Sequence, residues 1–339
     1  MQFSEQKLAE FFNRFEKLQV MVIGDVMLDS YIWGQVDRIS PEAPVPVVSV
    51  QKREDRLGGA ANVGLNLKAL GAQTFMCSVV GKDENGKILR NLMQQAGLNE
   101  EGLVESDFRH TTTKFRVLGN HTQMLRIDDE TTHALEPAVR QLLQSKILDL
   151  LSHHTPDVII FQDYDKGVIT PELIDFVMEE AKKRAIPVTV DPKKINFMAY
   201  HDVGLFKPNL KELQQGLNWV GPLNTMDEIV EASARLMEKL GVKIVLSTLS
   251  ENGVAVLWKE NGSLQHQLIP AHLRNITDVS GAGDTVISVA SLCLALRWGP
   301  VEMATLSNLA GGLVCEQVGV VPIDKQKLLE EAIQLLKTD

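Results

Sequence analysis

Apolar residues recur along the chain with the periods of helices and strands. Residues 4–18 predict an amphipathic helix, because four apolar side chains share one helical face: Leu8, Phe11, Phe12 and Phe15. The apolar run at 20–23 predicts a buried strand, which Gly24 interrupts. Residues 58–70 predict a second helix, which ends at Gly71.

From about residue 135 the pattern alternates between helix and strand, as βαβ units do. The predicted strands are apolar along their whole length and run into polar loops, as in DVIIFQDY, IPVTVDP, GLFKPN and KIVLSTLS. Two more helices are expected, one from Ala282 or Gly283 and one around 301–318. Such strands favour a parallel sheet that is covered on both faces, with functional residues at the carboxyl ends of the strands. The fold class is therefore α/β.

Two segments depart from this pattern. Residues 31–56 contain several prolines and alternate imperfectly, and residues 112–128 carry a turn signal at 119–120. Both segments suit the strands of a small β lid. No repeat, low-complexity segment or long linker divides the chain. We therefore expect residues 1–339 to form one domain that carries this lid.

Composition narrows the possible partners. With 34 Lys+Arg against 44 Asp+Glu, the formal net charge is −10, which disfavours a nucleic-acid partner but allows a local cationic site for an anionic substrate. The three cysteines are too far apart in sequence for a close-spaced zinc site. Neither a signal-peptide layout nor an apolar run of membrane-spanning length occurs. We expect no membrane partner and a cytoplasmic location.

The segment DVSGAGDTV at 278–286 carries the strongest chemical signal. Gly281 and Gly283 allow a tight turn whose N–H groups stay unobstructed, and the helix that follows adds its positive end, so the loop can hold an anion. Asp284 would then face an incoming hydroxyl and accept its proton during phosphoryl transfer. Taken alone, the segment is equally compatible with a glycine-rich turn in which Asp284 caps a helix.

Three further motifs place polar residues or glycines beside predicted strand ends or helix starts. Their residues are Asp25 and Asp29 in GDVMLD, Gly58, Gly59 and Asn62 in GGAAN, and Asn209 and Glu212 in KPNLKE. Asp25, Asp29 and Asn62 could bind sugar hydroxyls. Asn209 and Glu212 are three residues apart and could share one helical face. Each motif alone also fits a helix cap or a solvated turn. Four such motifs in the loops of one α/β pattern favour a single active site.

In this order, the motifs resemble the ribokinase-like (PfkB) sugar kinases across nearly the whole chain. The segments GDVMLDSY, RISPEAPVPVV, GGAANV, DYDKG, DPK, PNLKE and DVSGAGDTV are similar to the heptose-phosphate kinase branch of that family. The lid segment RISPEAPVPVV is the most discriminating, because general ribokinases do not usually share it. The resemblance implies a three-layer α/β/α fold with a mostly parallel central sheet and a small β-sheet lid, which often takes part in dimerisation. A homodimer through the lid is therefore expected.

The resemblance also implies an activity, the ATP-dependent phosphorylation of D-glycero-D-manno-heptose 7-phosphate at its anomeric hydroxyl. Asp284 matches the catalytic base, and the anion hole matches Gly281, Ala282 and Gly283. The sugar-binding positions match Asp25, Asp29, Gly58, Gly59 and Asn62. Asn209 and Glu212 match a motif for phosphate and Mg²⁺, with Glu212 acting through water. The nucleotide side matches Ser247, Thr248, Gly253 and Asn308, while Lys166 and Lys193 are candidates for phosphate contacts.

A phosphorylated sugar needs positive charge away from its reacting end. Lys114, Arg116 and Arg126 in the second lid segment could supply it, although an exposed charged strand face explains them equally well. Two residues depart from the family pattern: Ser280 stands where Thr is frequent, and Gln162 stands where Ser is common. The departure at Gln162 bears on the fine substrate preference.

Several alternatives stay open. Another sugar or nucleoside kinase of the same family, or a non-catalytic regulator that binds sugar or nucleotide, would share most of these motifs. The P-loop and dinucleotide-binding motifs are absent from the sequence, as is an HxGH nucleotidyl-transfer motif. The sequence leaves open the anomer, the exact sugar and any requirement for a monovalent cation.

Overall fold

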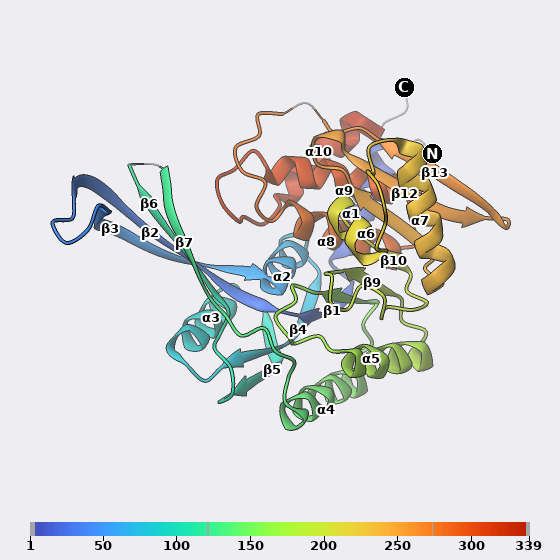
Figure 1. The fold of residues 1–339 in the computed structure, drawn as a ribbon. Helices are drawn as coiled ribbons and strands as arrows, with labels where there is room; N and C mark the ends of the chain where they lie inside the picture. Colours follow the sequence, from blue (N-terminus) through green and yellow to red (C-terminus); the bar gives the residue numbers. More distant parts are fainter. Residues whose placement is uncertain (1–3, 121, 273, 337–339) are drawn as a thin grey trace.

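We describe residues 4–120, 122–272 and 274–336 in a computed structural model. A nine-stranded sheet forms the centre of the molecule, in the order β13-β12-β11-β10-β9-β8-β1-β4-β5 (Figure 1). Its strands are β1 Gln19–Gly24, β4 Gln73–Gly81, β5 Asn99–Ser106, β8 Val158–Gln162, β9 Val188–Asp191, β10 Leu205–Phe206, β11 Ile244–Thr248, β12 Val254–Glu260 and β13 Ser263–Ile269. Neighbouring strands from β5 to β11 pair in parallel, and β12 pairs antiparallel with both β11 and β13. The mostly parallel sheet that the sequence predicts is confirmed.

Helices cover both faces of this sheet. The residues of β1 show the two faces: Val20 and Val22 belong to one apolar core, and Met21 and Ile23 belong to the other. The first core is closed by α1 Glu5–Phe15, α2 Ala60–Ala69, α3 Glu84–Gln95, α8 Ala282–Ala295, α9 Pro300–Val314 and α10 Lys325–Leu336. The second is closed by α4 Pro137–His153, α5 Pro171–Arg184, α6 Leu210–Gly216 and α7 Met226–Leu240.

A separate four-stranded sheet projects from this body (Figure 1). Its strands are β3 Pro46–Gly59, β2 Val26–Ile39, β6 Thr113–Gly119 and β7 Thr122–Asp129, in that spatial order. We call it the small sheet. The predicted segment 31–56 lies within β2, β3 and their connection, and both strands extend further toward the body. Asn120, with φ 52°, lies between β6 and β7, so the turn predicted at 119–120 is confirmed.

The predicted helices differ from the observed ones mainly at their ends. The first is shorter than predicted, and Ser4 caps it by accepting a hydrogen bond from the backbone N–H of Lys7. The helix predicted from residue 58 begins at Ala60, because Gly58 and Gly59 complete β3. The helix predicted around 301–318 ends at Val314, and α8 begins at Ala282 as expected. Within the described residues, no helix is both long and apolar enough to span a bilayer.

Candidate active site

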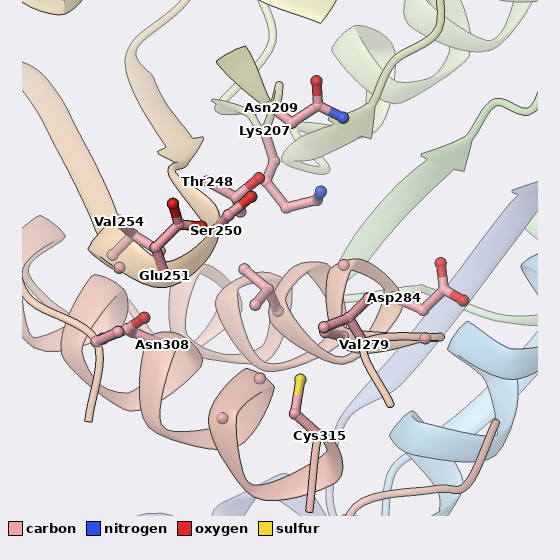
Figure 2. A pocket seen from close by; sticks show the side chains of 18 of the residues that line it. Lys207, Asn209, Thr248, Ser250, Glu251, Val254, Val279, Asp284, Asn308 and Cys315 are labelled. Atoms are coloured by element: carbon pink, nitrogen blue, oxygen red, sulfur yellow. The ribbon is translucent and has the colours of Figure 1, made fainter. Parts of the chain in front are cut away.

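A cavity of about 600 Å³ opens where β9, β10 and β11 end, beside the first turn of α8. Figure 2 shows Lys207, Asn209 and Asp284 toward one end of it and Glu251, Val254 and Asn308 toward the other. Ten of the predicted site residues line it: Lys193, Asn209, Glu212, Thr248, Gly253, Gly281, Ala282, Gly283, Asp284 and Asn308. The carboxyl ends of parallel strands therefore line this cavity, at the position where the sequence leads us to expect functional residues.

The glycine-rich loop lies directly before α8. Gly281 occupies the N-cap position with φ 81°, and no side chain caps the helix. A Cβ atom at Gly281 would lie 2.9 Å from Nδ2 of Asn62, so both the backbone angle and the available space require glycine here. An uncapped helix start that faces a cavity can bind a phosphate group.

Asp284 lies in the first turn of α8 and is only 5% exposed. Its Oδ2 accepts a hydrogen bond from Nδ2 of Asn62 at 2.8 Å. Its Oδ1 accepts hydrogen bonds from the hydroxyl of Tyr164 at 2.6 Å and from Nε2 of Gln162 at 3.1 Å. Burial raises the pKa of Asp284 to about 6, and the nearby Asp191 carboxylate also raises it, against the hydrogen bonds from Asn62 and Tyr164. A carboxyl with such a pKa can act as a general base near neutral pH.

Lys207 and Asp191 form an ion pair in the wall of the cavity that the sequence analysis did not assign. Their Nζ–Oδ2 distance is 3.1 Å, and both side chains are less than a tenth exposed. A Cβ atom at Gly283 would lie 3.6 Å from Nζ of Lys207, so this ammonium group is next to the glycine-rich loop. Their motifs, DPK and KPNLKE, were visible in the sequence. Only the pairing of β9 with β10 shows that the two side chains meet.

Asn209 and Glu212 form a capping box at the start of α6. Oδ1 of Asn209 accepts from the Glu212 backbone N–H at 2.8 Å, and Oε2 of Glu212 accepts from the Asn209 backbone N–H at 2.9 Å. Oε1 of Glu212 is paired with Lys193, whose Nζ lies 5.5 Å from the centre of the Tyr164 ring. Both carboxylate oxygens of Glu212 are thus engaged within the protein.

Two neighbouring residues at the end of β11, Ser247 and Thr248, are predicted to contact the nucleotide, and their side chains differ in position. Thr248 lines the cavity, but Ser247 is fully buried with a hydroxyl that has no partner in the described residues. Successive side chains of a strand point to opposite faces. The Ser247 side chain therefore faces away from the cavity, and the contact predicted for it stays a prediction. Ser250 and Glu251, in the turn after β11, line the cavity and were missed.

Asp25 is buried behind the cavity. Its carboxylate accepts hydrogen bonds from three backbone N–H groups of the loop after β8: Tyr164 at 2.8 Å, Lys166 at 3.2 Å and Val168 at 3.1 Å. Burial raises the pKa of Asp25. In this structure, the carboxylate holds the loop that carries Tyr164. The prediction that Asp25 binds sugar stays untested.

The other predicted sugar-side residues come from three places: Asp29, Gly58, Gly59 and Arg116 from the small sheet, Asn62 from α2, and Lys166 from the loop after β8. Asp29 accepts a hydrogen bond from Nη1 of Arg116 at 2.5 Å, and a Cβ atom at Gly58 would lie only 2.3 Å from Oδ2 of Asp29. The backbone of Gly59, with φ 58°, leads into α2 and toward Asn62. Lys166 pairs with Glu130 at 2.7 Å. None of these residues, Glu130 included, lines the cavity described above.

Lys114 and Arg126 differ in their surroundings. Lys114 is partly buried and has no ion-pair partner among the residues described, and burial together with the charge of Lys166 lowers its pKa. The side chain of Arg126 is 53% exposed and pairs with Asp128 on its own strand. The alternative of a solvated strand face therefore describes Arg126 better than Lys114.

Fold and site together define a carbohydrate kinase. The chain belongs to the pfkB family of carbohydrate kinases, whose family model matches residues 17–326. Enzymes of this class are phosphotransferases with a hydroxyl acceptor.

Its relatives point to one branch of this class. The chain is 41% identical over 317 residues to the "Bifunctional protein HldE" of Magnetococcus marinus, and 38% identical over 328 residues to that of Citrifermentans bemidjiense. These alignments cover 93% and 96% of this chain but only 64% and 66% of the relatives, so the chain spans roughly two thirds of their length.

Solved structures show the same fold. The crystal structure of phosphofructokinase-2 from Escherichia coli in complex with potassium matches with a TM-score of 0.77 at 20% identity, over 93% of this chain and 99% of that one. Arabidopsis thaliana ribokinase complexed with ribose and ATP matches with a TM-score of 0.68 at 19% identity, over 92% and 98% of the two chains. The ribokinase-like fold expected from the motifs is thereby confirmed.

The raised pKa of Asp284 has a consequence for stability. Between the ordinary Asp pKa of 3.8 and about 6, the folded protein retains a proton that the unfolded chain releases, so this carboxyl makes the protein less stable as pH rises. Asp284→Asn has no carboxyl to titrate at this position, so it should escape this loss of stability. We expect the unfolding free energy of Asp284→Asn minus that of the unsubstituted protein to increase by about 1–3 kcal/mol between pH 4 and pH 7.5. Urea titrations across this range measure the difference. A difference that does not vary with pH would contradict the raised pKa.

Proposed function

We propose that this protein is an ATP-dependent kinase that phosphorylates the anomeric hydroxyl of D-glycero-D-manno-heptose 7-phosphate, giving the 1,7-bisphosphate. The observation that carries the proposal is the buried Asp284 carboxylate beside an uncapped glycine-rich helix start, at the end of a cavity large enough for a nucleotide. The match to HldE relatives supports the heptose branch. A cytoplasmic location goes with this function, because ATP is an intracellular substrate.

In the proposed mechanism, Asp284 takes the proton of the sugar hydroxyl while the hydroxyl oxygen attacks the γ-phosphorus of ATP. The bond from phosphorus to the β–γ bridging oxygen breaks, and its electron pair leaves with ADP. The backbone N–H groups at the start of α8 and the ammonium group of Lys207 offset negative charge on the transferring group. Positioning by these fixed groups supplies most of the catalysis.

Magnesium is the metal that this chemistry implies. No group of three or more potential ligand side chains lies together among the described residues. Both oxygens of Glu212 are already engaged, which suits a carboxylate that holds Mg²⁺ through water beside the substrate phosphates. Bound there, Mg²⁺ would supply charge neutralisation of the ATP phosphates. The need for a monovalent cation stays an open part of the proposal.

The small sheet offers a site for the sugar's own phosphate. Lys114 and Arg116 share one face of the sheet with Asp29, because Asp29 pairs with Lys114 in register and Arg116 lies two residues further along β6. Arg116 is paired with Asp29, whereas Lys114 is partly buried and forms no ion pair with any residue that the structure describes. The carboxylates of Asp128, Asp29 and Glu130 act on Lys114 only at a distance, so a direct anionic ligand would be favourable there.

Removing the base tests the chemistry. Asp284→Asn keeps the shape of the site but cannot accept the proton, so kcat should fall by about 10²–10⁴-fold while ATP affinity stays close to that of the unsubstituted protein. Steady-state kinetics and calorimetric titration with ATP measure the two quantities. The exposed Asp175→Asn on α5 serves as the matched control and should leave both unchanged. Near-normal turnover in Asp284→Asn would remove Asp284 from the role of base.

The substrate is tested with ATP consumption on heptose 7-phosphate, fructose 6-phosphate, ribose, fructose and adenosine. We expect selective turnover of heptose 7-phosphate. Lys114→Met should raise the KM for the phosphorylated sugar about 10–100-fold and change kcat little, since it removes a contact distant from the reacting hydroxyl. Selective turnover of an unphosphorylated sugar, unaffected by Lys114→Met, would refute the phosphate site and the heptose assignment together.

We further propose a homodimer through the small sheet. The face opposite Lys114 and Arg116 is a row of apolar side chains from three strands: Ile32, Phe115, Val117, Leu125 and Ile127. Leu125 and Ile127 are 54% and 50% exposed, and an exposed apolar strand face is a ready pairing surface.

A charge in this row should separate the dimer. We expect the unsubstituted protein to have twice the mass of one chain by light scattering, and Ile127→Asp to have the mass of a single chain, because a dimer would bury the new carboxylate. Leu142→Asp, at a similarly exposed leucine on α4, should remain dimeric. An unchanged dimer in Ile127→Asp would place the interface elsewhere.

A further inference from the structure

The two oxygens of the Asp284 carboxylate are not equivalent. Oδ1 accepts two hydrogen bonds, from the Tyr164 hydroxyl at 2.6 Å and from Nε2 of Gln162 at 3.1 Å. Oδ2 accepts one, from Nδ2 of Asn62 at 2.8 Å. A carboxylate oxygen has about two lone-pair directions, so Oδ1 is saturated and Oδ2 has one place left. A further hydroxyl can therefore donate only to Oδ2.

Gln162 links this carboxylate to a second one. Its Nε2 also donates to Oδ2 of Asp191 at 3.1 Å, so the two N–H groups of one amide bridge the Asp284 and Asp191 carboxylates. The amide must present its nitrogen here, because its carbonyl would face two negatively charged oxygens. Its own Oε1 is buried and has no partner among the described residues. An unsatisfied buried carbonyl costs free energy, which the two charge-assisted bonds offset.

Tyr164 approaches from the loop that follows β8. Its backbone N–H is held by Asp25, and its side chain lines the cavity beside Lys193. Tyr164 is thus held at two points: Asp25 accepts a hydrogen bond from its backbone N–H, and Asp284 accepts one from its hydroxyl. Besides Tyr164, the titratable groups that face Asp284 or contribute to its electrostatic environment are Asp191, Lys193 and Lys207.

Given the proposed role of Asp284 as base, we propose that Tyr164 and Gln162 are positioning residues that saturate Oδ1, leaving Oδ2 to take the proton of the sugar hydroxyl. The O–H bond of the sugar breaks as the Oδ2–H bond forms, and the oxygen bonds to the γ-phosphorus while ADP leaves. Both residues also favour the ionised carboxylate: Tyr164 by donating to it, and Gln162 by donating and by lying between it and Asp191. Neither residue gains or loses a proton in the reaction.

The test is the pH dependence of kcat/KM, measured with whichever sugar the unsubstituted protein turns over. Tyr164→Phe and Gln162→Leu each remove a donor from Oδ1, so the acidic limb of the profile should move to higher pH by about one unit. On the alkaline plateau, kcat should stay within about tenfold of the unsubstituted protein, since Oδ2 still accepts the proton. A purely structural role would lower activity at every pH without moving the limb.

Tyr200→Phe provides the matched control. The Tyr200 hydroxyl also donates to a buried carboxylate, Oδ2 of Asp163, at 2.7 Å, but neither residue lines the cavity. This variant should lose stability and keep the position of the acidic limb. An unmoved limb in both Tyr164→Phe and Gln162→Leu, alongside an inactive Asp284→Asn, would overturn this inference and leave the proposed function standing. An active Asp284→Asn would instead overturn the proposed function itself.

Discussion

The burial of one carboxylate at the start of α8 is the constraint on which the rest of the site depends. Every residue of α8 from Asp284 to Cys293 is buried, so the helix cannot shift without disturbing the core. An ionised group in such a place requires donors around it. The chain supplies them from three elements: α2 through Asn62, the end of β8 through Gln162, and the following loop through Tyr164. The packing of the core and the geometry around the proposed base are therefore a single arrangement.

A series of linked charged groups leads outward from this carboxylate. Asp284 is linked through the Gln162 amide to Asp191, and Asp191 is paired with Lys207. Lys193 and Glu212 form a second ion pair among the residues that line the cavity. In a site of low dielectric, such fixed charges act strongly on a phosphate and need no rearrangement when it reacts. This is the arrangement that phosphoryl transfer requires, because the protein contributes position and charge rather than covalent chemistry.

The small sheet has two faces with different chemistry. Alternation along its strands places Asp29, Lys114 and Arg116 on one face and apolar residues such as Phe115 and Ile127 on the other. A sheet exposed to solvent on both sides would gain little from the apolar row. In the proposed function, the same four strands hold the substrate on one face and a second chain on the other, so the proposed sugar binding and the proposed dimer would be coupled.

The sequence by itself determined the features that rest on local rules. The helical face of α1, the apolar parallel strands, the turn at 119–120 and the glycines before Asp284 depend on spacing or on backbone angles within a few residues. The capping pair of Asn209 and Glu212 is of the same kind. The direction of the Ser247 side chain also follows a local rule, because alternation along β11 turns it away from the side chain of its neighbour Thr248.

Only the tertiary structure decided which distant side chains meet. The hydrogen bond from Gln162 to Asp284 spans 122 residues, and the bond from Asn62 spans 222. The pairing of Lys207 with Asp191 follows from β9 lying beside β10, which the composition of neither strand specifies. A local pattern predicts that a residue lies at a strand end. The strand order and the packing of α8 determine what it faces, because they set the distances across which charges and hydrogen bonds act.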